Sequence, residues 1–134
     1  LKGTQTQDIL WGLVGNVLTA APADATLIAS HVAFMVQDGT LYASVADGTT
    51  QNRSDVSLGI TLTNANEYEI VFTGGTNAVF KINGTTVATL STNIPPGTDS
   101  ASINWQMIIT NQTTNTTNGG MMRLWHPYFI KAKV

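Results

Sequence analysis

The sequence predicts an all-β protein, folded as a sandwich or barrel of short antiparallel strands. Apolar and polar residues alternate in several short runs, which is the pattern of half-buried strands. Glycine- and asparagine-rich corners separate these runs. Threonine supplies 21 of the 134 residues, and its branched Cβ suits a pleated surface. These observations predict roughly nine to eleven strands and no long helix.

The clearest prediction is a three-stranded meander within Glu67–Leu90. Its apolar residues occupy alternate positions on either side of two glycine-containing corners. The first corner is Gly74-Gly75. The second is Asn83-Gly84, a dipeptide that favours a type I′ turn because both central residues need positive φ. We therefore expect two tight hairpins in succession.

A second hairpin is predicted from strands His31–Val36 and Leu41–Ala46, joined by a turn at Asp38-Gly39. Thr49–Asp55 is predicted as a polar loop because it has no apolar residue. Val56–Leu62 is predicted as a strand because its apolar residues alternate strictly.

The two ends of the chain contribute further strands. Asp8–Gly15 is a continuous apolar run, which predicts a strand buried on both faces or a strand with a bulge at Gly12. Ala101–Thr110 is predicted as a strand anchored by Trp105. The remaining predictions are strands at Leu1–Thr6 and Met121–Val134, and loops at Val17–Ile28, Ser91–Ser100 and Asn111–Gly120. A short helix from Ala23 is the alternative to the first of these loops.

Length and composition limit the classes of function that this chain is expected to have. A chain of 134 residues suits one domain, so residues 1–134 are predicted as a single unit, and the start at Leu1 within a strand-like run suggests a piece of a longer or processed chain. Only 10% of residues are charged, against about 25% in an average domain, which favours an extracellular or virion setting.

The composition also argues against several kinds of binding site. The six basic residues are scattered along the sequence, so no basic patch for nucleic-acid binding is expected. The sequence has no cysteine for a thiolate metal site and no run of about 18 apolar residues for a membrane span.

The order of several short motifs resembles a known family. The motifs are Trp-Gly-Leu-Val, Asp-Gly-Thr-Leu-Tyr-Ala, Ala-Asp-Gly-Thr, Glu-Tyr-Glu-Ile, Val-Phe-Lys-Ile-Asn-Gly-Thr-Thr-Val-Ala-Thr-Leu and Thr-Asn-Ile-Pro, spread over about Leu10 to Val134. They resemble the concanavalin-A-like (laminin-G-like) jelly-roll domains of phage and viral structural proteins and bacterial surface proteins. The resemblance implies a two-sheet antiparallel β-sandwich whose larger, concave sheet often holds carbohydrate.

Enzymes, including glycoside hydrolases, occur on the fold that this resemblance implies. Glycoside hydrolysis needs two carboxyl groups that face the scissile bond. Glu67 and Glu69 are the only glutamates, and no third carboxylate follows them as in glucan-cleaving relatives. His31 and His126 lie in strand-like runs without a Ser-His-Asp context, which favours structural roles. We therefore predict no enzymatic activity.

Binding residues are suggested by aromatic and acidic side chains. Trp125, Tyr128, His126 and Tyr42 are the candidate carbohydrate-contacting residues, because sugar rings stack on aromatic faces, whereas Trp11 and Trp105 are predicted to lie in the core. Asp38 and Asp47 are the candidate ligands for a calcium ion, although their Asp-Gly turns explain them without one. No other cofactor is predicted.

Three functions follow from these observations. The first is a non-catalytic structural or adhesive module of a virion (capsid decoration, fibre or tail) or of a cell surface, self-associating or packed on other structural proteins. The alternative is a lectin-like module that binds a glycan. A glycoside hydrolase is the minor alternative. Neither nucleic-acid binding nor membrane insertion is expected.

Overall fold

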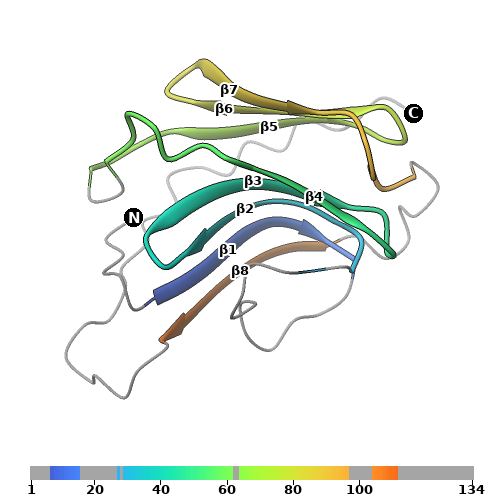
Figure 1. The fold of residues 1–134 in the computed structure, drawn as a ribbon, viewed down its shortest axis with the longest axis horizontal. Coiled ribbons are helices and arrows are strands. Elements are labelled where there is room, and N and C mark those ends of the chain that lie inside the picture. The colour runs from blue at the N-terminus through green and yellow to red at the C-terminus, as the bar shows by residue number, and fades with distance from the viewer. Residues whose placement is uncertain (1–6, 16–26, 28, 62–63, 97–103, 112–134) are drawn as a thin grey trace.

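The chain folds into two antiparallel β-sheets with no helix among the residues that the structure describes. This computed structural model describes residues 7–15, 27, 29–61, 64–96 and 104–111. Its strands are β1 (Gln7–Val14), β2 (His31–Gln37), β3 (Thr40–Ala46), β4 (Gln51–Asp55), β5 (Tyr68–Thr73), β6 (Asn77–Ile82), β7 (Thr85–Leu90) and β8 (Asn104–Asn111). The strand order is β4-β3-β2-β1-β8 in one sheet and β5-β6-β7 in the other. The predicted all-β, two-sheet antiparallel architecture is confirmed, and Figure 1 shows the two layers stacked.

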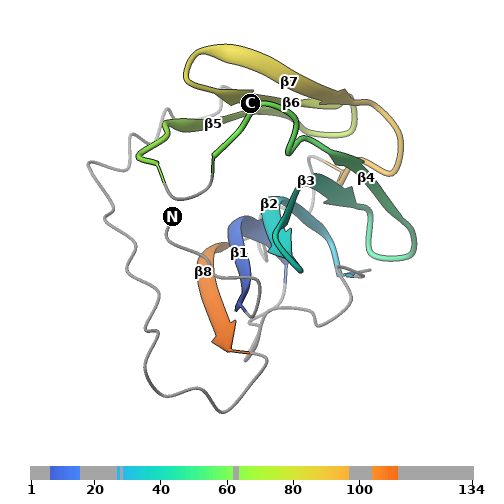
Figure 2. The ribbon, with the colours of Figure 1, turned by 60° about the vertical axis from the view of Figure 1, so that its left-hand side comes forward.

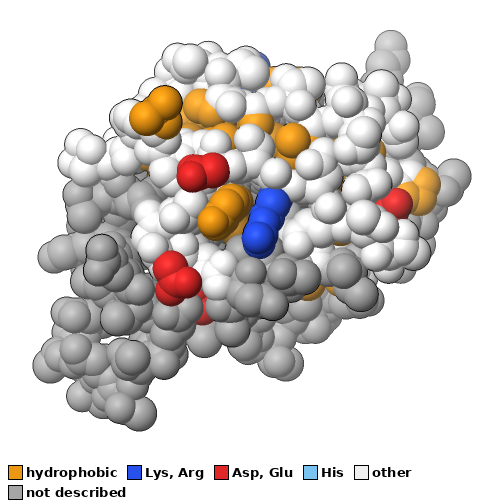
Figure 3. Space-filling view, in the orientation of Figure 1, with side chains coloured by type: hydrophobic (Ala, Val, Ile, Leu, Met, Phe, Trp, Pro, Cys, Tyr) orange, Lys and Arg blue, Asp and Glu red, His pale blue; other side chains and the backbone are white. Residues whose placement is uncertain are grey.

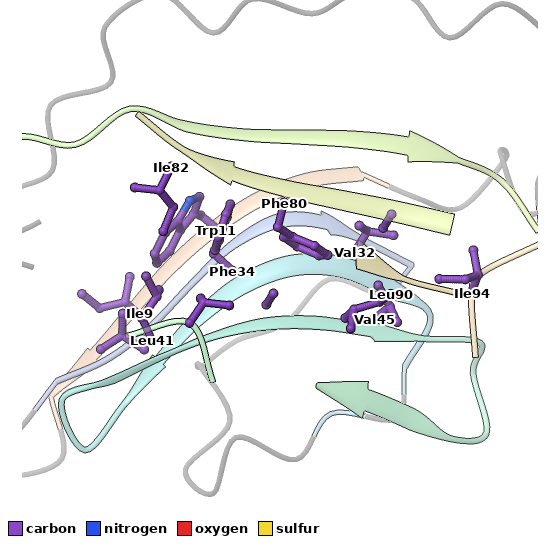
Figure 4. Close-up of a cluster of buried hydrophobic side chains, with 14 residues drawn as sticks. Ile9, Trp11, Val32, Phe34, Leu41, Val45, Phe80, Ile82, Leu90 and Ile94 are labelled. Atoms are coloured by element: carbon purple, nitrogen blue, oxygen red, sulfur yellow. The ribbon is translucent and has the colours of Figure 1, made fainter. Parts of the chain in front are cut away.

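The main core fills the space between the sheets (Figure 4). Phe34 of β2 lies at its centre, with its ring 5.4 Å from Trp11, 5.3 Å from Tyr68 and 5.1 Å from Phe80, measured between centroids. Aromatic pairs at this spacing contribute about 0.5–1.5 kcal/mol beyond their burial. The prediction that Trp11 belongs to the core is confirmed, since it is 3% exposed.

β1 is buried on both faces, as its unbroken apolar run predicts. Leu10 and Val14 point away from the second sheet and Ile9 and Trp11 point towards it, yet all four are buried. The register with β2 runs through Gly12 without a break, so the strand has no bulge there. Glycine is needed because a Cβ at this position would lie 2.3 Å from the carbonyl oxygen of Val32.

Both predicted hairpin regions are confirmed. Asp38 and Gly39 have φ of 47° and 77°, and Asn83 and Gly84 have φ of 51° and 77°, so both turns use the positive-φ geometry that these residues tolerate. Asn83 also holds the start of β5, because its Oδ1 accepts a hydrogen bond from the Glu67 backbone N–H at 2.9 Å.

Two neighbouring predictions between β3 and β5 are wrong. Thr49–Asp55 was expected to be a loop, but Gln51–Asp55 forms the edge strand β4, because its backbone completes the outer edge of β3. Val56–Leu62 was expected to be a strand, but Ser57–Ile60 forms a turn in which the Ile60 N–H donates to the Ser57 carbonyl at 3.0 Å. Gly59 permits this turn with a φ of 77°.

The layers diverge towards β8. Figure 2 shows them close together near β4 and β7 and far apart near β5 and β8. Trp105 of β8 is therefore 40% exposed, which corrects the prediction that it lies in the core. Ser91–Pro96 forms the expected connection without a strand. The predicted strands at Leu1–Thr6 and Met121–Val134 and most of the loops at 17–28 and 111–120 lie outside the described residues.

Candidate functional site

Tyr42 lies on the outer face of the five-stranded sheet, the face turned away from the second sheet. It is half-buried on β3 and lies opposite Asp55 of β4. The Arg53 guanidinium carbon lies 5.1 Å from the centroid of the Tyr42 ring, within the range of a cation–π interaction. We call Tyr42, Arg53 and Asp55 the Tyr42 site. It combines an aromatic ring with a planar donor and a carboxylate acceptor, groups that suit a hydroxyl-rich ligand.

The Tyr42 ring is not an open platform, because Arg53 covers part of it. Asp55 is exposed, and its Oδ1 accepts a hydrogen bond from the Ser57 backbone N–H at 2.8 Å. The other predicted sugar-contacting residues, Trp125, His126 and Tyr128, lie outside the described residues.

A chain of buried and half-buried hydrogen bonds lies on the same outer face. His31 Nδ1 donates to the Ala29 carbonyl at 2.7 Å, and because a carbonyl only accepts, His31 Nε2 must accept from the Ser44 hydroxyl at 2.8 Å. Gln51 Nε2 donates to the Ser44 oxygen at 2.8 Å. Gln51 Oε1 accepts from the Leu27 N–H at 3.1 Å. We call His31, Ser44 and Gln51 the polar network; it ties β2, β3 and β4 to the chain that precedes β2.

Burial keeps the His31 imidazole neutral. Burial lowers the pKa of His31 to about 4, and the hydrogen bond to Ala29 opposes this shift only in part. A Ser-His contact at this distance is the geometry of a nucleophile and its base. However, Ser44 and His31 are both 0% exposed, so a substrate cannot reach them in this conformation. The contact therefore acts as structural support for the outer face.

This pair is not predicted from the sequence, in which His31 has no Ser-His-Asp context and is expected to be structural. The signal was present in the hairpin itself, because His31 opposes Ala46 and Ser44 opposes Ala33 across β2 and β3, which places the two polar residues diagonally on one face.

Asp38 and Asp47 lie at opposite ends of β3. The seven residues of that strand separate them by about 20 Å, so they do not form one metal site together. Asp38 is exposed in its turn. Asp47 Oδ1 accepts from Thr50 N–H at 2.9 Å and from the Thr49 N–H and hydroxyl at 2.8 and 2.7 Å. These bonds, led by the one from Thr50, lower the pKa of Asp47.

No group of three His, Asp or Glu side chains within the described part of the chain is close enough to hold a metal ion. Each predicted calcium ligand would need further oxygen ligands beyond those placed here.

Glu67 and Glu69 lie at the start of the meander, where both are exposed. Glu69 Oε1 accepts from Lys81 Nζ at 3.1 Å in a surface ion pair. Glycoside hydrolysis by these two residues stays the minor alternative, which Glu67→Gln and Glu69→Gln variants would test in an assay for glycan cleavage.

The outward face of the three-stranded sheet is rich in β-branched residues and carries no net charge. It consists of Glu69, Val71, Thr73, Asn77, Val79, Lys81, Thr86 and Thr89, and we call it the β5–β7 face. Val71 is 43% exposed at its centre, opposite Val79. The Glu69–Lys81 pair is its only charged feature, and the two charges cancel.

The rest of the described surface is sparsely charged as well. Figure 3 shows few charged side chains on the face in view, where basic and acidic groups lie apart from one another. No helix in the described residues is long and apolar enough to cross a membrane. Comparison of the chain with family models, curated proteins and solved structures found no match in any of the three.

Proposed function

We propose that this protein is a jelly-roll module of the concanavalin-A-like type that works by packing and adhesion rather than by catalysis. Its setting is a virion, as a capsid decoration, fibre or tail component, or an extracellular cell surface. Its partners are further copies of itself or other structural proteins of the same assembly. The observation that carries this proposal is the β5–β7 face.

This face has the properties of a packing surface. β-branched side chains have few rotamers, so ordering Val71, Val79 or Thr89 at an interface costs little conformational entropy. Interface cores are depleted in charged residues, and here the Glu69–Lys81 pair neutralises itself. Two such faces can therefore approach each other without electrostatic repulsion.

Size-exclusion chromatography with light scattering tests the proposal. We expect the parent chain to form a defined oligomer or to join a larger particle, and a Val71→Lys/Thr89→Lys double variant to remain monomeric with an unchanged melting temperature. Leu58→Lys is the matched control, because Leu58 is 98% exposed in the Ser57–Ile60 turn and is not part of the β5–β7 face. A strictly monomeric parent chain that joins no particle would contradict the proposal.

Glycan binding at the Tyr42 site is the second candidate. It is favoured by the ring, guanidinium and carboxylate that converge on the outer face of the larger sheet. Binding on a broad glycan array should fall at least 10-fold in Tyr42→Ala and Arg53→Ala, and remain in Leu58→Ala. Trp125→Ala and Tyr128→Ala test the other predicted platform residues. Absence of any signal on the array removes this candidate.

A further inference from the structure

The hydrogen bonds of the polar network all run in one direction. They begin at the backbone N–H of Leu27, which can only donate, and end at the backbone carbonyl of Ala29, which can only accept. Between these ends Gln51, Ser44 and His31 each accept one bond and donate the next, at 3.1, 2.8, 2.8 and 2.7 Å in order. Both ends fix the same direction, so these donors and acceptors match only while the imidazole is neutral.

One additional proton on His31 breaks this match. A protonated imidazole donates from both nitrogens, so its Nε2–H would meet the hydrogen of the Ser44 hydroxyl. That hydroxyl must then turn, and within the network its new acceptor is Gln51 Oε1 after rotation of the amide. The rotation brings Gln51 Nε2 to the Leu27 N–H, where two donors face each other. A proton added at His31 is therefore felt at Leu27, the other end of the network.

The charged groups on the neighbouring strands do not compensate a proton on His31. On β4, Arg53 lies opposite Ser44, and a second cation there disfavours a charged imidazole. On β1, His31 lies opposite Val14, and the acidic residue on the same face is Asp8 at the far end of the strand. Six residues separate Val14 from Asp8, which corresponds to about 20 Å.

The segments at the ends of β2 and β3 do not supply a counter-charge either. The described residues before β2, at positions 27, 29 and 30, are uncharged. Asp47 follows β3, but its Oδ1 already accepts hydrogen bonds from Thr49 and Thr50. Protonation of buried His31 is therefore opposed by the fold, in agreement with its lowered pKa of about 4.

Leu27 and β4 are the parts of the outer face that the polar network holds in place. Leu27 packs against a buried apolar cluster made of Leu10, Val14, Ala33 and Met35. β4 is an edge strand, and its one neighbour among the described strands is β3. A segment held by so few contacts can open at a lower cost than unfolding of the whole domain.

We propose that the polar network is an acid-sensitive latch: protonation of His31 reverses its hydrogen bonds and releases Leu27 and β4 from the outer face, while the core between the sheets stays folded. The release uncovers the apolar cluster under Leu27. This inference does not depend on the proposed packing function, because the β5–β7 face belongs to the other sheet.

NMR titration of the full-length chain tests the coupling along the network. The signals of the Leu27 backbone amide and the Gln51 side-chain amide should move with the same midpoint as the His31 imidazole. In Ser44→Ala the connection between His31 and Gln51 is cut, so His31 should titrate without moving the Leu27 signal. The proposal is overturned if Leu27 does not follow His31 in the parent chain, or still follows it in Ser44→Ala.

Hydrogen exchange, corrected for the intrinsic effect of pH on exchange, measures the release itself. A pKa that rises from about 4 to 6.5 on opening increases the opening constant roughly 50-fold between pH 7 and pH 4.5. We expect β4 to lose at least 10-fold more protection than β6 over this range, and His31→Gln to show no such difference. An equal loss in both strands, or the same difference in His31→Gln, overturns the proposal.

Discussion

The two faces of the five-stranded sheet both carry buried residues, but they depend on different interactions. The inner face is held by packed rings, with Phe34 at the centre. The outer face also has buried apolar residues, such as Leu10 and Met35, but it surrounds the polar network of His31, Ser44 and Gln51. Packing tolerates imperfect replacements, whereas a buried polar network is stabilising only when each member has its partner.

The largest expected effect is on the inner face. Phe34→Ala should lower the free energy of unfolding by about 3–5 kcal/mol, because it leaves a cavity among three other rings. Phe34→Leu should cost less than half as much. Urea denaturation measures both, and a loss below about 1 kcal/mol for alanine would show that the core collapses around the cavity.

The outer face should respond to pH. The pKa of His31 is about 4 in the fold and 6.5 when unfolded, so the unfolded chain binds the additional proton between these values. The contribution of His31 to the free energy of unfolding is therefore complete above pH 6.5. It is lost as the pH falls towards 4, by about 3 kcal/mol in total.

The comparison with His31→Gln isolates this effect, since other titrating groups are common to both proteins. The difference in unfolding free energy between parent and variant should change with pH between 6.5 and 4. A constant difference over that range would show that His31 does not titrate as its burial requires.

A smaller effect is expected when the polar network is cut at its centre. Ser44→Ala removes the hydroxyl that joins His31 Nε2 to Gln51 Nε2, so the buried His31 and the half-buried Gln51 each lose this partner. We expect a loss of about 1–3 kcal/mol at pH 7 in chemical denaturation. Thr86→Ala, at an exposed strand position, is the control and should change stability by no more than about 0.5 kcal/mol.

The smallest effect is expected at the exposed edge of the outer face. Arg53→Ala removes the cation over Tyr42, and at an exposed site this should cost about 0.5–1 kcal/mol. Arg53→Lys should retain part of this cation–π stabilisation. An effect as large as that of Ser44→Ala would mean that Arg53 belongs to the polar network.

The regions that could be predicted from sequence are those whose structure is decided locally. Asn83-Gly84 and Asp38-Gly39 specify their turns through backbone geometry, so the hairpins on both sides followed directly. Gln51–Asp55 could not be recognised as a strand in this way. Its residues are polar, and the segment is extended because its backbone pairs with β3. Val56–Leu62 was wrongly predicted as a strand for the opposite reason. Its apolar residues alternate, but the segment turns at Gly59 and leaves Leu58 exposed.

The candidate site likewise contains residues that could be selected from the sequence and contacts that could not be predicted from it. Tyr42 could be selected from sequence as an aromatic residue in a strand, but its contact with Arg53 depends on the register between β3 and β4. The polar network likewise joins residues from three strands. The Tyr42–Arg53 contact and the Ser44–Gln51 hydrogen bond leave no trace in local spacing, whereas the His31–Ser44 pair follows from the register of the β2–β3 hairpin.

Residue pattern and turn chemistry alone determined that this chain is all-β, which hairpins it contains and which residues alternate along them, because φ preference and side-chain period act over a few neighbours. Only the packing of one sheet on the other decided which aromatic residues are buried, as the contrast between Trp11 and Trp105 shows. The physical reason is that burial depends on the width of the covering layer, and that width is set by strand pairing between distant parts of the chain.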